Sequence, residues 1–151
     1  AAHQQGIEVV PLVGPSSILL AVMGAGMNGQ SFAFKGYLSA KRPQLAKDLK
    51  LLEKQVQRRG ETQIFIETPY RNDAVFERAL QVLEPQTLFS IAVDLTLPTQ
   101  LIKTHTIQQW QKEEKPELHK RLAVFVVGKA NVCYTTIFRR AASRHERQML
   151  P

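Results

Sequence analysis

Hydrophobic and polar positions follow two different patterns along the first 128 residues. Short runs of β-branched and aromatic residues are typical of strands, while longer stretches with an apolar residue at every third or fourth position are typical of helices. These patterns predict strands at 7–13, 31–38, 63–67, 88–93, 100–106 and 122–127, helices at 16–25, 44–59 and 73–83, and a single helical turn at 107–111.

The helix expected at 44–59 has the most regular pattern in the chain. Its apolar residues fall on one stripe, and lysines and arginines occupy much of the remaining surface. Gly60 follows directly and suits a helix end, because glycine readily adopts the left-handed conformation found there. We therefore expect this helix to pack on the core through Leu45, Leu49, Leu52 and Val56.

The order of the elements predicts an α/β fold. Helices separate the earlier strands, as in parallel crossovers, whereas the later strands follow one another with little helix between them, as in antiparallel pairs. We therefore expect a mixed sheet of five or six strands flanked by helices over residues 1–128. Residues 129–151 show no clear period, and we expect a basic tail there that is either disordered or adds one strand at 133–138.

Charge and composition narrow the class of protein. Of the net charge of +7, residues 129–151 contribute +4, from five basic residues and one acidic residue, so this tail either binds nucleic acid or is a solvated extension. The lone Cys133 excludes an internal disulfide framework and a cysteine-based zinc site, and the scattered histidines show no metal-ligand spacing.

No stretch is apolar for long enough to cross a membrane, which favours a cytoplasmic protein. Residues 1–6 resemble the last turn of a helix before a glycine, so we expect a piece of a longer protein.

Three of the expected strands end in short polar or proline-containing breaks, at 13–17, 66–71 and 94–97. Ligands of open α/β sheets gather beyond the carboxyl ends of strands, where helix starts present free N–H groups. The breaks therefore indicate a ligand site at one sheet edge, although tight, well-capped connections would give the same pattern. The generic motifs of serine hydrolases, P-loops, dinucleotide folds and zinc proteases do not occur in the sequence.

Four motifs give this pattern a more specific interpretation. They read V-V-P-L-V-G-P-S-S at 9–17, F-K-G-Y-L at 34–38, F-I-E-T-P-Y-R at 65–71 and D-L-T at 94–96. In this order and spacing they resemble the second half of the tetrapyrrole methylase family of S-adenosylmethionine (SAM)-dependent methyltransferases, over about residues 6–128. Within the family, the likeness is greatest to the branch that methylates small-subunit ribosomal RNA. The resemblance implies that this chain is the C-terminal domain of a homodimeric protein that binds SAM between two domains.

The resemblance also implies which residues form the site. The turn at 14–17, the E-T-P break and the D-L-T region would contact SAM, mainly through the backbone. Arg71 would hold a substrate carboxylate or an RNA phosphate, or would instead form an ion pair with Asp73 at the start of a helix. No catalytic residue and no metal ligand can be assigned. The residues that would contact SAM are Ser16, Ser17, Ile66, Glu67, Thr68, Leu95, Thr96 and Leu97.

Departures from the family pattern leave three functions open. Tyr70 replaces the histidine of an S-P-H-R motif, and V-D-L-T-L-P-T-Q at 93–100 replaces R-E-L-T-K-x-[HY]-E, with the loss of charged residues. The first function is methylation of a ribose 2′-hydroxyl in ribosomal RNA, with the small ribosomal subunit as partner. The second is C-methylation of a tetrapyrrole, although that branch has Y-M-G where this chain has the F-I-E-T-P segment. The third is a non-catalytic domain that binds RNA or dimerises.

Overall fold

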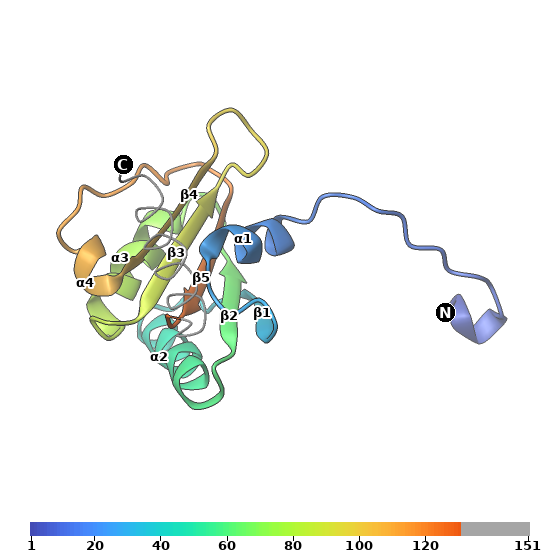
Figure 1. The fold of residues 1–151 in the computed structure, drawn as a ribbon, viewed down its shortest axis with the longest axis horizontal. Helices are drawn as coiled ribbons and strands as arrows, with labels where there is room; N and C mark the ends of the chain where they lie inside the picture. The colour runs from blue at the N-terminus through green and yellow to red at the C-terminus, as the bar shows by residue number, and fades with distance from the viewer. Residues whose placement is uncertain (131–151) are drawn as a thin grey trace, which may run out of the picture.

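The structure of the chain, a computed structural model, describes residues 1–130 and contains one mixed sheet with helices on both faces (Figure 1). The strand expected at 133–138 and most of the basic tail lie outside the described residues. In the described part, no helix has the length and apolar character that a membrane crossing requires. In chain order the elements are a 3-10 turn at His3–Gln5, α1 (Ser17–Ala25), β1 (Phe32–Tyr37), α2 (Arg42–Arg59), β2 (Thr62–Ile66), α3 (Asn72–Val82), β3 (Leu88–Val93), β4 (Leu101–Thr106), α4 (Ile107–Trp110) and β5 (Ala123–Gly128).

The five strands lie in the order β1-β2-β5-β3-β4. β1 and β2 are parallel, whereas β5 runs antiparallel to both β2 and β3, and β4 runs antiparallel to β3. The last of the five described strands, β5, therefore lies between β2 and β3, which are parallel to each other. This arrangement confirms the mixed sheet: helical crossovers join β1, β2 and β3, a loop at 94–100 joins β3 to β4, and a longer segment that contains α4 joins β4 to β5.

The larger part of the core fills the space between the sheet and helices α2, α3 and α4. Phe65, Phe89 and Phe125, from the three central strands, stack with ring centroids 5.2 Å (Phe65–Phe125) and 5.9 Å (Phe89–Phe125) apart. The stripe expected on α2 packs in this core, since all four of its residues are buried. These central strands are buried on both faces, which explains why their sequences are mostly apolar and do not alternate with exposed polar residues.

Within residues 1–130, α1 is the one helix that covers the opposite face of the sheet, and it does so mainly through small residues. Ala21, Val22 and Ala25 pack on a second group of buried side chains from the sheet. The approach is close, since a Cβ atom at Gly24 would lie 2.7 Å from Cδ1 of Ile102. The helix can lie this close to the sheet because the side chains that it turns toward the sheet are small.

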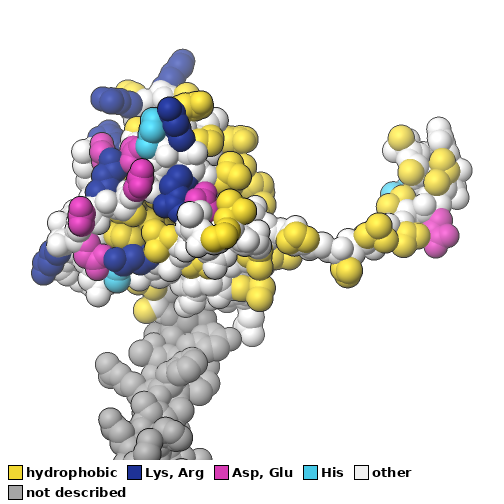
Figure 2. Space-filling model, turned by 90° about the horizontal axis from the view of Figure 1, so that it is seen from above, with side chains coloured by type: hydrophobic (Ala, Val, Ile, Leu, Met, Phe, Trp, Pro, Cys, Tyr) yellow, Lys and Arg dark blue, Asp and Glu magenta, His cyan; other side chains and the backbone are white. Residues whose placement is uncertain are grey.

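The prediction of a strand at 7–13 is wrong. This segment has no regular structure, and all of its side chains are exposed; Val13, for example, retains its full accessibility. In Figures 1 and 2 it runs away from the domain, on the side where hydrophobic side chains gather. Its apolar character indicates burial, but a strand forms only where a neighbouring strand pairs with its backbone, and the described sheet ends at β1 and β4 without it.

Candidate cofactor site at the strand ends

One pocket lies where three strands end and a fourth begins. Since β2 and β3 are parallel, their carboxyl ends reach the same edge of the sheet, and β5 starts between them. The pocket, here called the strand-end pocket, has a volume of about 510 Å³, which is in the usual range for small-molecule sites. Its lining residues are Ser17, Tyr37, Ile66, Glu67, Thr68, Pro69, Ala92, Asp94, Leu95, Thr96, Leu97, Leu122, Ala123 and Val124.

Seven of the eight residues that the family resemblance implies for SAM contact line this pocket. They come from the start of α1, the loop after β2 and the loop after β3, so the fold brings together segments that are far apart in sequence. Ser16 is the exception. It is the N-cap of α1, and its side chain accepts a hydrogen bond of 3.5 Å from the N–H of Leu19, so it serves the helix start as expected from the sequence.

The remaining lining residues were not predicted from the sequence. Tyr37 ends β1, and Asp94 immediately precedes the D-L-T residues already assigned. The segment Leu122–Val124 starts β5 and carries no motif of its own. Its place in the pocket follows from the insertion of β5 between β2 and β3, a feature of topology that no local pattern signals.

The loop after β3 has an unusual backbone that is fixed by neighbouring side chains. Asp94 and Thr96 have φ angles of 49° and 70°, which non-glycine residues rarely adopt and which cluster at ligand-binding loops. Nε of Arg121 donates to the Asp94 carboxylate at 2.8 Å, and the Thr99 hydroxyl donates to the same oxygen at 2.9 Å. The hydrogen bond from Arg121 is the main cause that holds the pKa of Asp94 below its usual value, against the opposing effect of desolvation.

Arg121 is itself positioned by a buried amide. The side chain of Asn72, at the start of α3, donates to the backbone oxygens of Leu118 at 3.1 Å and of Arg121 at 2.7 Å. Asn72 has no exposed surface, so these contacts anchor the loop before β5 to the helix without competition from water. The chain between α4 and β5 is thereby held in the position from which Arg121 reaches Asp94.

The loop after β2 is fixed by a second ion pair. The carboxylate of Glu67, which is 1% exposed, contacts both terminal nitrogens of Arg71 at 3.1 Å and accepts the N–H of Thr68 at 2.9 Å. Arg71 also donates to the backbone oxygen of Ser39 at 3.0 Å. The alternative expectation, an ion pair between Arg71 and Asp73, is therefore wrong. The carboxylate of Asp73 contacts Nζ of Lys115 at 3.0 Å instead.

These contacts define what the strand-end pocket can do. Both acidic residues that line it, Glu67 and Asp94, are paired with arginines. The other walls combine aliphatic side chains with backbone and hydroxyl groups, which suits a ligand that has apolar and hydrogen-bonding parts. Within residues 1–130, no three histidine, cysteine, aspartate or glutamate side chains are grouped so as to hold a metal ion. The lining of the pocket is thus suited to binding and orienting a molecule.

The chain is similar in sequence to known RNA methyltransferases. It is 35% identical over 129 residues to the ribosomal RNA small subunit methyltransferase I of Vibrio cholerae, and 28% identical over 129 residues to the protein of that name from Escherichia coli O157:H7. Each alignment covers 83% of this chain but only 43% or 44% of the relative. The chain therefore spans less than half the length of these curated relatives. No family model matches the chain.

The fold also has a counterpart among solved structures. The methyltransferase CobJ matches with a TM-score of 0.53 and 24% identity, over 85% of this chain and 55% of CobJ. This likeness confirms the expected α/β sheet of the tetrapyrrole methylase type. The sequence relatives, in turn, agree with the family resemblance drawn from the motifs.

Proposed function

We propose that this chain, whose sequence and fold are those of the tetrapyrrole methylase family, is the SAM-binding C-terminal domain of a ribosomal RNA methyltransferase. The observation that carries the proposal is the strand-end pocket. Seven residues chosen by motif alone, from three separate segments, line this single pocket of about 510 Å³. The motifs place these residues at strand ends and at a helix start, and the fold joins those ends in one pocket.

The residues of the pocket fit SAM. Leu95, Thr96 and Leu97 would lie beside the adenine, while Ile66, Glu67 and Thr68 would contact the ribose and methionine part, and Ser17 closes the pocket at the start of α1. SAM supplies an activated methyl group, so the protein need not generate a reactive species of its own. The role of these residues is to hold and align the cofactor, which supplies a large part of the rate enhancement in such transfers.

We further propose that the acceptor is a ribose 2′-hydroxyl of small-subunit ribosomal RNA. The names of the sequence relatives and the net charge of +7 support an RNA substrate. A hydroxyl acceptor benefits from a base, and the paired Glu67 and Asp94 do not fill that role, so the base would come from outside the strand-end pocket. We propose in addition that the working protein is a cytoplasmic homodimer, since the ribosomal subunit is found there and dimers are usual in the family.

The proposal can be tested with the full-length gene product and SAM labelled on its methyl group. One reaction contains undermethylated small ribosomal subunits, and a second contains a uroporphyrinogen-type tetrapyrrole. We expect label in the ribosomal RNA, mapping to a ribose. Ser17→Trp should abolish both the transfer and SAM binding measured by calorimetry, because the indole would fill the pocket. Gln57→Trp adds the same side chain on the exposed face of α2 and should leave both unchanged.

Other outcomes would identify the remaining functions. Label in the tetrapyrrole, with none in the RNA, would assign the protein to the C-methylating branch of the family. No transfer to either acceptor, with no SAM binding, would leave a domain that has kept the fold and lost the chemistry. A Ser17→Trp protein that still binds SAM would place the cofactor elsewhere.

A further inference from the structure

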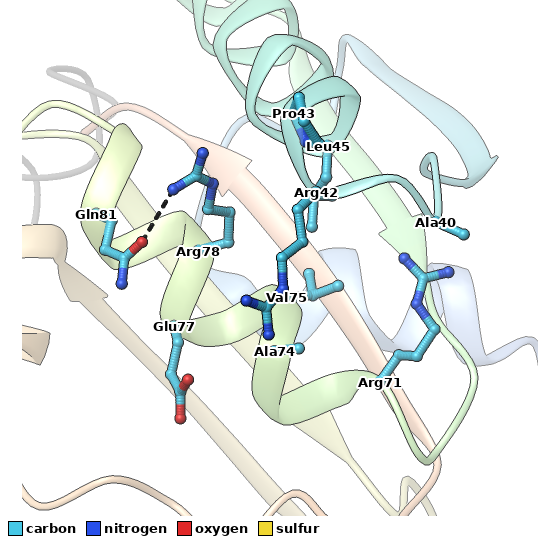
Figure 3. Close-up of a pocket in the computed structure, with 10 residues that line it drawn as sticks. All are labelled: Ala40, Arg42, Pro43, Leu45, Arg71, Ala74, Val75, Glu77, Arg78 and Gln81. Carbon is cyan, nitrogen blue, oxygen red and sulfur yellow. Dashed lines mark hydrogen bonds between the residues drawn. The ribbon is translucent and has the colours of Figure 1, made fainter.

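A second pocket, of about 420 Å³, lies between the start of α2 and helix α3 (Figure 3). Three of its lining side chains are arginines, namely Arg42, Arg71 and Arg78, so we call it the arginine pocket. It adjoins the strand-end pocket through one ion pair, since Arg71 lines the arginine pocket and its partner Glu67 lines the other. A molecule held in one pocket is therefore close to a molecule held in the other.

Two of the three arginines carry charge that no carboxylate in the described part of the chain neutralises. Arg71 is occupied by Glu67, but neither Arg42 nor Arg78 forms an ion pair within residues 1–130. The one acidic side chain that lines the pocket, Glu77, points away from the arginines in Figure 3 and contacts Nζ of Lys115 at 2.7 Å. The pocket is therefore electropositive.

The guanidinium of Arg78 is also short of a hydrogen-bond acceptor. One terminal nitrogen donates to Oε1 of Gln81 at 3.1 Å, whereas its Nε is buried and has no partner among the described residues. A buried donor without an acceptor is costly, and the cost is greatest for a charged group. Only one terminal nitrogen of Arg78 is engaged, by Gln81, so an anion bound in the pocket would accept from the other terminal nitrogen; Nε is closed to solvent and would gain an acceptor only through a shift of the side chain.

Helix α2 adds to the same field at its first turn. Its N-cap, Lys41, offers no side-chain acceptor to the free N–H groups, and the helix begins with Arg42. The start of a helix of 18 residues carries partial positive charge and favours anions. In Figure 3, Arg42 extends from this start toward α3, and Arg78 extends from α3 toward α2, so both border the space between the helices.

We propose that the arginine pocket binds a backbone phosphate of the substrate RNA, through Arg42 and Arg78. The planar guanidinium fork matches phosphate oxygens, and phosphate contacts fix the register of a nucleic acid on a protein. A phosphate held here would bring a neighbouring ribose toward the strand-end pocket, across the Glu67–Arg71 pair. The inference rests on the proposed function, because it assumes that the acceptor is RNA.

The test compares two double variants of the full-length protein. Arg42→Gln/Arg78→Gln removes two charges from the pocket. Arg58→Gln/Arg59→Gln removes two charges from the exposed last turn of the same helix, about 25 Å away. The affinity for a small-subunit ribosomal RNA fragment is measured by fluorescence anisotropy at several salt concentrations. SAM affinity and the melting temperature are measured for each variant, to show that it is folded.

We expect the pocket variant to bind RNA about ten- to a hundredfold more weakly, with unchanged SAM affinity. The slope of log affinity against log salt concentration should fall by about 0.7 to 0.9 for each phosphate that the protein no longer neutralises. Arg42→Lys/Arg78→Lys keeps the charge but loses the fork, so it should lie between wild type and the glutamine variant. The control variant should bind RNA less than threefold more weakly than wild type.

Three results would overturn the proposal. The first is an equal loss of RNA affinity in the two glutamine variants, because the loss would then follow from the lower net charge of the protein and not from the pocket. The second is RNA binding by the pocket variant that equals wild type while wild type methylates ribosomal RNA, in which case the proposed function stands without this site. The third is tight binding of polyglutamate in the same pocket, which would assign it to carboxylates. Failure of the proposed function has a different signature, since wild type itself would then transfer no methyl group to RNA.

Discussion

Two ion pairs, Glu67 with Arg71 and Asp94 with Arg121, fix the two loops that line the strand-end pocket. Arg71 follows Glu67 by four residues, whereas Arg121 reaches Asp94 from the loop before β5, and each arginine compensates the charge of a mostly buried acid. The second pair holds a loop with two left-handed residues, a conformation that costs of order 1 kcal/mol or more for each residue. The binding surface is therefore shaped by charges that do not themselves react.

Replacing Asp94 by asparagine should expose this dependence. At pH 7 we expect a loss of about 1 to 2 kcal/mol in the free energy of unfolding, because the charge-assisted hydrogen bond from Arg121 is weakened. The pKa of Asp94 is lowered by folding, so its contribution is complete above the ordinary value of 3.8 and is lost as the pH falls through the lower folded value. The difference between wild type and variant should therefore shrink below about pH 4. Urea unfolding from pH 7 to pH 2 measures it.

Glu114→Gln is the matched control for this series. Glu114 is exposed and forms no ion pair within residues 1–130, so its neutralisation should leave the free energy of unfolding within about 0.5 kcal/mol of wild type. A difference for Asp94→Asn that stays constant from pH 7 to pH 2 would contradict the assignment, because it would arise from packing and not from charge.

Sequence reasoning identified the pocket residues that belong to motifs and missed those that act across the fold. Ser17 and the segments 66–68 and 95–97 lie at strand ends or at a helix start, where the chain order already suggests a shared edge. Arg121 and Asn72 could not be found in this way. Their contacts join residues 27 positions apart, for Arg121 and Asp94, and 46 apart, for Asn72 and Leu118. No local pattern carries that information.

At the scale of elements, helix α2 is the part of the chain that local pattern describes best. Its apolar stripe faces the aromatic core, and Gly60 ends it with a φ of 66°. The segment 7–13 shows the limit of the same reasoning. Apolar β-branched composition indicates that a segment favours burial in a sheet, but it does not supply the neighbouring strand that the backbone requires.

The stripe on α2 makes a quantitative prediction. Leu49→Ala should lower the free energy of unfolding by about 2 to 5 kcal/mol, since Leu49 is fully buried and the truncation leaves a cavity against the sheet. Leu51→Ala, on the same helix, removes a side chain that is 55% exposed and should cost less than about 1 kcal/mol. Denaturant unfolding of the two variants gives the comparison. Equal losses would show that α2 does not pack through the stripe.

The whole molecule combines these elements through a strand order that the sequence does not reveal. β5 is the last strand within residues 1–130, yet it separates β2 from β3, and its start, with Leu122 before it, lines the strand-end pocket. The hydrophobic pattern predicted a strand at 122–127, but it fits any central place in the sheet equally well. The consequence for function is that the pocket is complete only when β5 has paired, so ligand binding depends on the fold as a whole.

Hydrogen exchange tests this dependence in the full-length protein. At a SAM concentration of 100 times its dissociation constant, opening of the bound state is disfavoured by about 2.7 kcal/mol, which slows exchange about 100-fold. We expect segments 66–69, 94–97 and 122–124 to gain protection together, because all three line one pocket. The start of α2 should gain protection only when RNA is added, if the arginine pocket holds a phosphate. Protection confined to a single strand end would contradict a shared site, whereas protection of the start of α2 by SAM alone would show that the two pockets do not bind separate ligands.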